Sequence, residues 1–282
     1  MIKEYVPEFD IFFLEEQDLL EFEGNLQDVF VMPRGEFFNH SSYGQIQLVN
    51  SFLYWQISRN AQYVIIAHPD WITSLTDGTR NELFKVQVKM KRGLIFPFSL
   101  FQNETKIPTD YIVEIDNEKF VIIQKAMWDQ LPFKYKEVFL KIYALEWDNC
   151  KGQKVPENIP AHLIRYANRY PEKSGSNCLA ATLFAITGHD WMVHEWVHPE
   201  TFVQGLKNAR YNLIDSEIRP GDIVTWESTE GMIQHATYHI SSNLFFNKNG
   251  QTFFNPWKIV HKDELYESWK KYKIKVYRKQ DG

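Results

Sequence analysis

Residues 174–188 read SGSNCLAATLFAITG, a polar loop that runs directly into an apolar segment. The run from Cys178 to Thr187 has the length of a short helix, and Gly188 stands where a left-handed residue commonly ends one. Cys178 therefore falls at the start of the predicted helix. Unpaired backbone N–H groups and the helix dipole favour a thiolate there, and the same N–H groups can stabilise an oxyanion.

The segments around this helix predict further helices and a small sheet. A helix is expected over 161–168, and a second over 199–209, where Pro199 suits a first turn. Strands are expected over 222–226, 233–240 and 244–247. Helices that precede a small antiparallel sheet indicate an α+β domain over residues 151–282.

The first 150 residues predict a separate β-rich domain, whose role we leave open. Every second residue from Phe84 to Met90 is apolar, which is the period of a half-buried strand. A hairpin is expected over 111–123, and further strands over 45–57 and 62–67. The segment 133–147 fits a helix or a strand. A polar stretch with Gly and Pro over 148–156 places the boundary at 150.

Bulk composition narrows the class of protein. The chain has 282 residues with a net charge of −5, which argues against a general nucleic-acid binder. We find no apolar run long enough to span a membrane and no secretory leader, so we expect a cytoplasmic protein, or one released by another route. The two cysteines do not form a disulfide framework, and Cys150 is expected to be buried or in the linker.

A histidine and an asparagine are candidate partners for Cys178. His235 begins the strand over 233–240, and we expect its side chain to face the helix that carries Cys178. If the following hairpin closes about Ser241, Asn247 lies opposite His235 and can orient the imidazole. Closure about Ser242 would select Asn249 instead.

Three segments together resemble the NlpC/P60 superfamily and its CHAP relatives. They are Asn177-Cys178-Leu179-Ala180-Ala181, the run from Gly221 to Trp226, and the run from His235 to Ile240. Members are papain-like cysteine hydrolases that usually cleave peptide bonds of bacterial cell-wall stems. The resemblance covers the C-terminal domain only, and many cell-wall members have Asp-Cys-Ser where this chain has Asn177-Cys178-Leu179.

The resemblance implies a papain-like fold with Cys178 as nucleophile, His235 as general base and Asn247 as the third polar residue. It implies a thiol-dependent amide hydrolase or acyltransferase that needs no cofactor and acts on a small peptide or a peptidoglycan-like substrate. The choice between hydrolase and transferase and the oligomeric state stay open.

Two other classes of function compete with this one. His194-Glu195-Trp196-Val197-His198 matches the HExxH pattern of zinc hydrolases, with Glu217 downstream as a third ligand. Pro199, however, disfavours helical geometry at His198, so we expect the pattern to span two elements and to bind no metal. The remaining alternative is a non-catalytic binding protein on a decayed papain-like scaffold.

Overall fold

A computed structural model describes residues 2–43, 57–91, 94–101, 107–148, 151–173 and 175–280. The chain divides into two compact units, Ile2–Tyr143 and Ala144–Gly282. The division falls inside helix α7 (Phe133–Trp147), a little before the boundary expected at residue 150. No helix in the described ranges is both long and apolar enough to cross a membrane.

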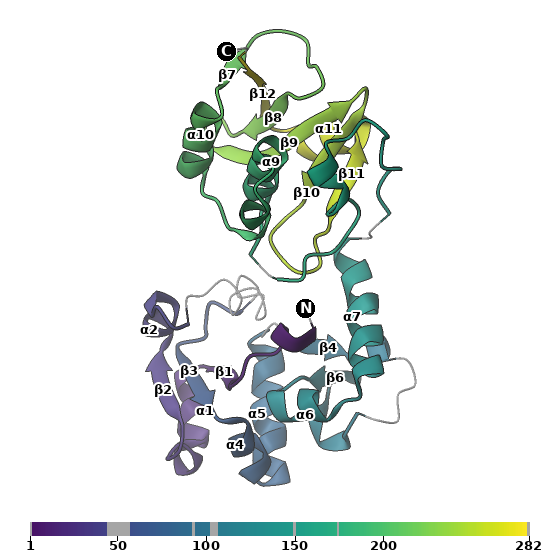
Figure 1. Cartoon of the computed structure of the whole chain (residues 1–282). Helices are drawn as coiled ribbons and strands as arrows, with labels where there is room; N and C mark the ends of the chain where they lie inside the picture. The colour runs from purple at the N-terminus through teal and green to yellow at the C-terminus, as the bar shows by residue number, and fades with distance from the viewer. Residues whose placement is uncertain are drawn as a thin grey trace. The chain divides into compact units, whose positions relative to one another are not determined.

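The N-terminal unit mixes helices with strands, so the expectation of a β-rich domain is wrong (Figure 1). Its described residues form two three-stranded sheets, with strand orders β1-β3-β2 and β4-β6-β5. The strands are β1 (Asp10–Leu14), β2 (Phe30–Pro33), β3 (Tyr63–Ala67), β4 (Ile95–Pro97), β5 (Ile112–Ile115) and β6 (Glu118–Ile122). The helices are η1 (Ile2–Glu4), α1 (Glu16–Glu21), η2 (Glu23–Asn25), α2 (Arg34–Asn39), α4 (Pro69–Ser74), α5 (Asp77–Lys89), η4 (Phe98–Phe101), η5 (Thr109–Tyr111), α6 (Lys125–Gln130) and α7.

Helix α5 replaces the strand expected from Phe84 to Met90. Thr76 caps its start, where its hydroxyl accepts a hydrogen bond from the Thr79 N–H at 3.2 Å. Gln87 is fully buried, and its side-chain amide pairs with the backbone N–H and C=O of Phe13 in β1 at 2.9 and 3.0 Å. Because hydrogen bonds to Phe13 satisfy its amide, Gln87 is buried although it is polar. The alternation of apolar and polar residues from Phe84 to Met90 therefore does not separate a buried side from a solvent side.

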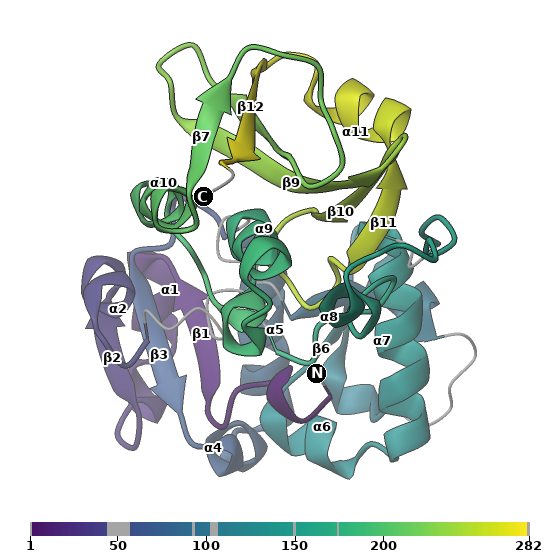
Figure 2. The same ribbon diagram turned by 45° about the horizontal axis from the view of Figure 1, so that its top comes forward.

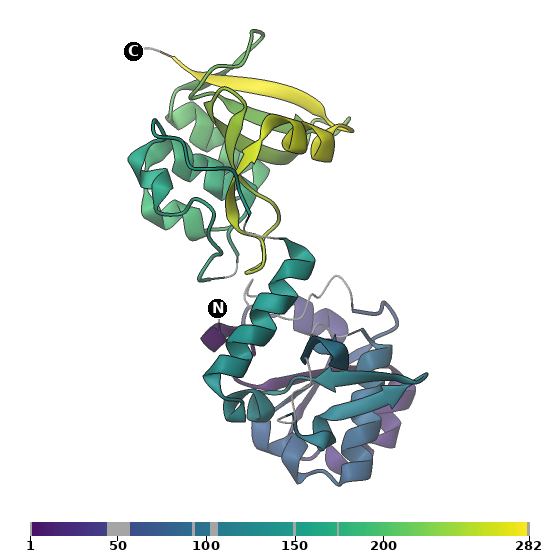
Figure 3. The same cartoon turned by 90° about the vertical axis from the view of Figure 1, so that its right-hand side faces the viewer.

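Two of the strand predictions for the N-terminal unit are confirmed. The hairpin is confirmed as β5 and β6, joined by Asp116 and Asn117 with φ of 52° and 65°. The strand over 62–67 is confirmed as β3, and the ambiguous segment 133–147 is the helix α7. Figure 3 shows α7 beside the sheet, where Phe96 of β4 contacts Phe139 at 4.9 Å between ring centroids. The expected strand over 45–57 lies outside the described residues except at its last position.

The C-terminal unit is built on a six-stranded antiparallel sheet with strand order β11-β10-β9-β8-β12-β7. Helices and this sheet make an α+β unit, as expected. Its strands are β7 (Tyr211–Ile214), β8 (Ile223–Glu227), β9 (Ile233–Ser241), β10 (Leu244–Lys248), β11 (Trp257–His261) and β12 (Lys273–Lys279). Its helices are α8 (Ala161–Ile164), α9 (Cys178–Thr187), η6 (Asp190–His194), α10 (Pro199–Asn208) and α11 (Lys262–Trp269). The strands and helices expected around residues 161–247 are confirmed, although α8 is shorter than expected.

Helices cover both faces of this sheet, with α9 on one side and α11 on the other (Figure 2). On the first side, which we call the α9 face, Ala236 of β9 packs with Leu179 and Ala180. On the second side, the α11 face, Trp226 of β8 packs with Leu265. Because successive side chains of a strand point to opposite faces, this assignment fixes the side on which every site residue lies.

Candidate functional site around Cys178

Cys178 is the first residue of α9, as expected, and it is partly exposed. Asn177 caps the helix, because its side-chain oxygen accepts a hydrogen bond from the Ala180 N–H at 3.0 Å. The same side chain donates to the Val197 carbonyl at 2.7 Å and so ties the helix start to the next segment. Gly188 ends the helix with φ of 72°. The Asn177 side chain therefore fixes the start of α9, where the Cys178 thiol lies.

Two residues on the α9 face of the sheet, Ala236 and Lys248, influence Cys178. Cys178 packs against the cluster that contains Ala236, and a hydrogen bond joins the thiol to the Ala236 backbone. Lys248 lies on the same α9 face, since Phe246, two residues earlier in β10, packs with Phe184 of α9. Lys248 and Cys178 interact electrostatically. The charge of Lys248 therefore acts to lower the pKa of the thiol.

Lys248 is fully buried, which is rare for a lysine. Its Nζ donates to the Asn255 carbonyl at 2.6 Å and lies 5.8 Å from the centre of the Trp257 ring. Burial lowers the pKa of Lys248 from 10.5 to about 7, although the nearby Cys178 and Asp148 act in the opposite direction. Near neutral pH the amine is therefore divided between its charged form and a neutral form that can accept a proton.

The Cys178 thiol is subject to opposed influences. Burial raises its pKa above the ordinary value. Hydrogen bonds from the backbone of Ala236, Leu179 and Cys178 itself, together with the charge of Lys248, act to lower it. Because burial dominates, the resting group is a thiol, and attack on a substrate requires a base that removes its proton.

His235 and Asn247 are brought together as expected. His235 Nε2 lies 2.7 Å from Asn247 Oδ1, and Asn247 Nδ2 donates to Asn249 Oδ1 at 3.1 Å. The imidazole is 1% exposed and stacks on Trp269 at the end of α11, with ring centroids 4.2 Å apart. Burial lowers the pKa of His235 to about 4, although the hydrogen bond to Asn247 opposes this shift. The imidazole is therefore neutral at physiological pH.

The expectation that His235 faces Cys178 is wrong. His235 contacts Trp226 and Trp269, which belong to the α11 face, whereas its neighbour Ala236 lies against α9. The structure therefore brings two of the three expected residues together and places the third on the other side of the sheet. The physical reason is that the polar face of β9, which carries His235, Thr237 and His239, is buried beneath α11, where each of these side chains forms a hydrogen bond, so polarity does not mark an open face that meets α9.

The register of the β9–β10 hairpin also differs from the expected one. Phe246 pairs with Tyr238, and a bulge lies between Leu244 and Phe245, so the hairpin is centred on Ser242 rather than Ser241. Asn247 consequently reaches His235 diagonally rather than from the directly opposed position. Asn247 rather than Asn249 is thus the hydrogen-bond partner of His235, as expected. The hairpin register from which it was expected, centred on Ser241, is wrong.

The HExxH pattern spans two elements, as expected. His194 ends η6, and its ring packs against Tyr166 and Trp257 at 5.8 Å from each. His198 is the N-cap of α10 and stacks on Trp196. Two histidines in separate elements do not share one helical face. Within the described parts of the chain, no group of three or more His, Cys, Asp or Glu side chains could hold a metal ion.

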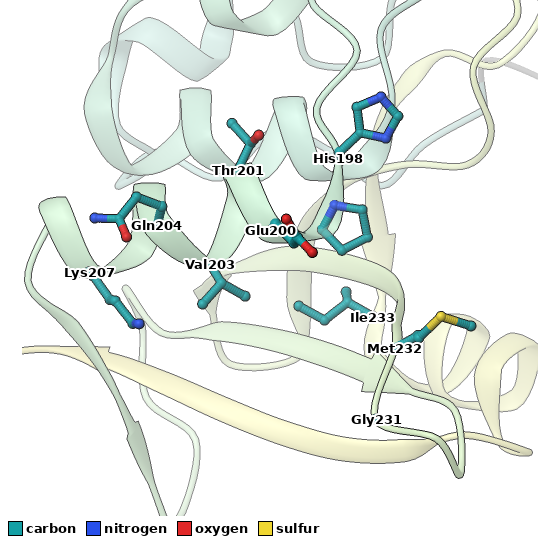
Figure 4. Close-up of a pocket in the computed structure, with 10 residues that line it drawn as sticks. His198, Glu200, Thr201, Val203, Gln204, Lys207, Gly231, Met232 and Ile233 are labelled. Atoms are coloured by element: carbon teal, nitrogen blue, oxygen red, sulfur yellow. The ribbon is translucent and has the colours of Figure 1, made fainter.

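A pocket of about 850 Å³ lies next to the cluster that contains Cys178 (Figure 4). Val203 of α10 and Ile233 of β9 line it and also pack in or against that cluster. Met232 from the β8–β9 turn and Lys207 from α10 lie at its edges. A bound molecule in this pocket would contact the same apolar residues that support the Cys178 helix.

Lys248 is the residue that the sequence interpretation missed. Its position in β10, two residues after Phe246 and four after Leu244, was a signal that it shares the buried face. The other cysteine, Cys150, lies outside the described residues.

Comparison with known proteins adds no relative to this description, because the chain matches no family model, no curated protein and no solved structure.

Proposed function

We propose that the C-terminal unit is a papain-like domain that catalyses thiol-dependent acyl transfer or amide hydrolysis, with Cys178 as nucleophile and Lys248 as its base. The observation that carries this proposal is the placement of a partly exposed cysteine at a helix start together with a fully buried lysine on the same face of the sheet. The general logic is that of a nucleophile activated by an adjacent base, of which serine–lysine pairs are a known variant.

The proposed reaction begins with proton transfer from the Cys178 thiol to the neutral Lys248 amine. The thiolate attacks the carbonyl carbon of an amide or ester, and the backbone N–H groups at the start of α9 stabilise the oxyanion. Lys248 then returns its proton to the leaving group as the carbon–nitrogen or carbon–oxygen bond breaks. Water or an acceptor amine attacks the resulting thioester and releases Cys178. The resemblance to NlpC/P60 proteins favours a peptide or peptidoglycan-like amide as substrate.

A second function is favoured by one observation, the burial of His235 on the face opposite Cys178. In the resembled family this histidine is the base, and its position here fits a scaffold that has lost that chemistry. The second candidate is therefore a non-catalytic binding domain, in which Cys178 is an inert packing residue.

Acetylation by p-nitrophenyl acetate distinguishes the two candidates. The intact mass of the full chain should increase by one acetyl group at Cys178, and Cys178→Ser should remove this modification. We expect Lys248→Met to slow the acetylation on the order of 100-fold, the usual size of general-base assistance, while Lys271→Met and His235→Gln leave it unchanged. Equal rates in wild type and Lys248→Met, with both proteins folded, would contradict the proposed base and favour the binding domain.

A further inference from the structure

A second pocket, of about 600 Å³, opens between α9, η6 and α10. Its lining combines the apolar residues Met192 and Val197 with the exposed side chains of Trp191, Trp196, Glu195 and Glu200. Gly205 of α10 allows α9 and α10 to pack closely, because a Cβ atom there would lie 2.8 Å from Leu183 Cδ2 of α9. The hollow is thus formed by tightly packed elements.

Two tryptophans at this pocket are exposed to solvent. Trp191 is 63% exposed and Trp196 is 42% exposed, although large aromatic side chains are normally buried. The Trp196 ring stacks on His198 at 5.9 Å between centroids, with the two planes 15° apart, which restrains its orientation. Exposed aromatic faces that border a hollow indicate a surface that a ligand covers.

The charges at this pocket all have one sign. The ionisable side chains that line it are two carboxylates, Glu195 and Glu200, and both are exposed. Neither forms an ion pair within the described residues, whereas the adjacent Asp190 is paired with Arg165 at 2.6 Å. The start of α10 alone would favour an anion, but Glu200 in its first turn already supplies that charge. The excess is therefore negative and favours a cation.

We propose that this pocket binds an alkylammonium group, such as the side chain of a lysine in a polypeptide partner. The ammonium lies over the faces of Trp191 and Trp196 and against the two carboxylates, since tryptophan is the strongest aromatic partner for a cation. The alkyl stem packs on Met192 and Val197. The proposal is independent of the chemistry at Cys178, because the lining of this pocket does not include the thiol.

The test is a titration of the full chain, followed through the indole N–H signals of Trp191 and Trp196 by nuclear magnetic resonance. Nα-acetyl-lysine N-methylamide is the probe, and Nα-acetyl-norleucine N-methylamide is the matched uncharged control. We expect the lysine probe to shift both signals to saturation, with an affinity at least ~10-fold higher than that of the norleucine control. Trp196→Leu and the double variant Glu195→Gln with Glu200→Gln should each lose most of the binding.

The control variant is Glu230→Gln, which neutralises an exposed glutamate in the β8–β9 turn and should leave the affinity unchanged. Cys178→Ser should also bind normally, which separates this proposal from the one about catalysis. Equal binding of the lysine and norleucine probes, or full affinity in the folded double glutamine variant, would overturn the proposal. Shifts of both indoles with N-acetylglucosamine and none with the lysine probe would identify a saccharide site and would overturn it as well.

Discussion

His235 Nε2 and Asn247 Oδ1 lie 2.7 Å apart on the α11 face of the sheet, while Cys178 lies with α9 on the opposite face. The pair thus has the short contact expected of a histidine and its orienting residue. The His235 ring is, however, buried and stacks on Trp269. Lys248 lies with Cys178 on the α9 face, and it is the group that we propose exchanges a proton with the thiol.

Burial of neutral His235 makes stability depend on pH in the acid range. The pKa of His235 is about 4 in the folded chain against an ordinary value of 6.5, so below 6.5 the unfolded chain binds a proton that the folded chain does not. The free energy of unfolding should therefore fall by about 3 kcal/mol between pH 7 and pH 4 from this residue. Urea unfolding at both values should show a correspondingly smaller loss in His235→Gln. An equal loss of unfolding free energy in wild type and His235→Gln would show that the pKa of His235 is not lowered in the folded chain.

Lys248 should produce a slope of the same sign in the alkaline range. Its folded pKa is about 7 against 10.5, so above pH 7 the folded chain has released a proton that the unfolded chain keeps. Stability should rise by about 2 kcal/mol between pH 7 and pH 8.5. The comparison is made between Cys178→Ala and the same variant with Lys248→Met, so that thiol ionisation does not contribute. A rise of equal size in both would mean that Lys248 titrates normally.

Asn177 should contribute to stability through three side-chain hydrogen bonds. Its oxygen accepts from the Ala180 N–H at 3.0 Å and from the Val197 N–H at 3.4 Å, and its amide donates to the Val197 carbonyl at 2.7 Å. Asn177→Ala removes all three and should lower the free energy of unfolding by about 1–2 kcal/mol. Asn208→Ala, at the exposed end of α10, serves as the control and should change stability little. If Asn177→Ala lowered the free energy of unfolding no more than Asn208→Ala does, the side chain of Asn177 would not stabilise the start of α9.

The sequence predicted those elements whose ends carry local signals. Helix α9 follows from its apolar run and from Gly188, and the β5–β6 hairpin follows from Asp116 and Asn117. These residues act on neighbours in the chain, so their effect can be inferred without knowledge of the rest of the fold.

The orientation of β9 could not be inferred in this way. Its burial pattern has buried residues on both faces, because α9 covers one and α11 the other. The polar residues of β9, His235, Thr237 and His239, are themselves buried and hydrogen-bonded, so their alternation with apolar residues does not show which face meets a given helix. The same problem affected α5, where Gln87 is buried by bonds to Phe13, a residue distant in the chain.

The central claim is that Lys248, and not His235, controls the reactivity of Cys178. The most direct measurement is the rate of iodoacetamide alkylation at Cys178 against pH, with Cys150 in the same molecule as the reference thiol. In wild type and in His235→Gln the rate should rise as Lys248 loses its proton near pH 7, because only the neutral amine accepts the proton of the thiol. In Lys248→Met the rise should move above pH 9, since burial raises the pKa of the thiol from 9.0. A profile that Lys248→Met leaves unchanged, or that His235→Gln abolishes, would contradict the account.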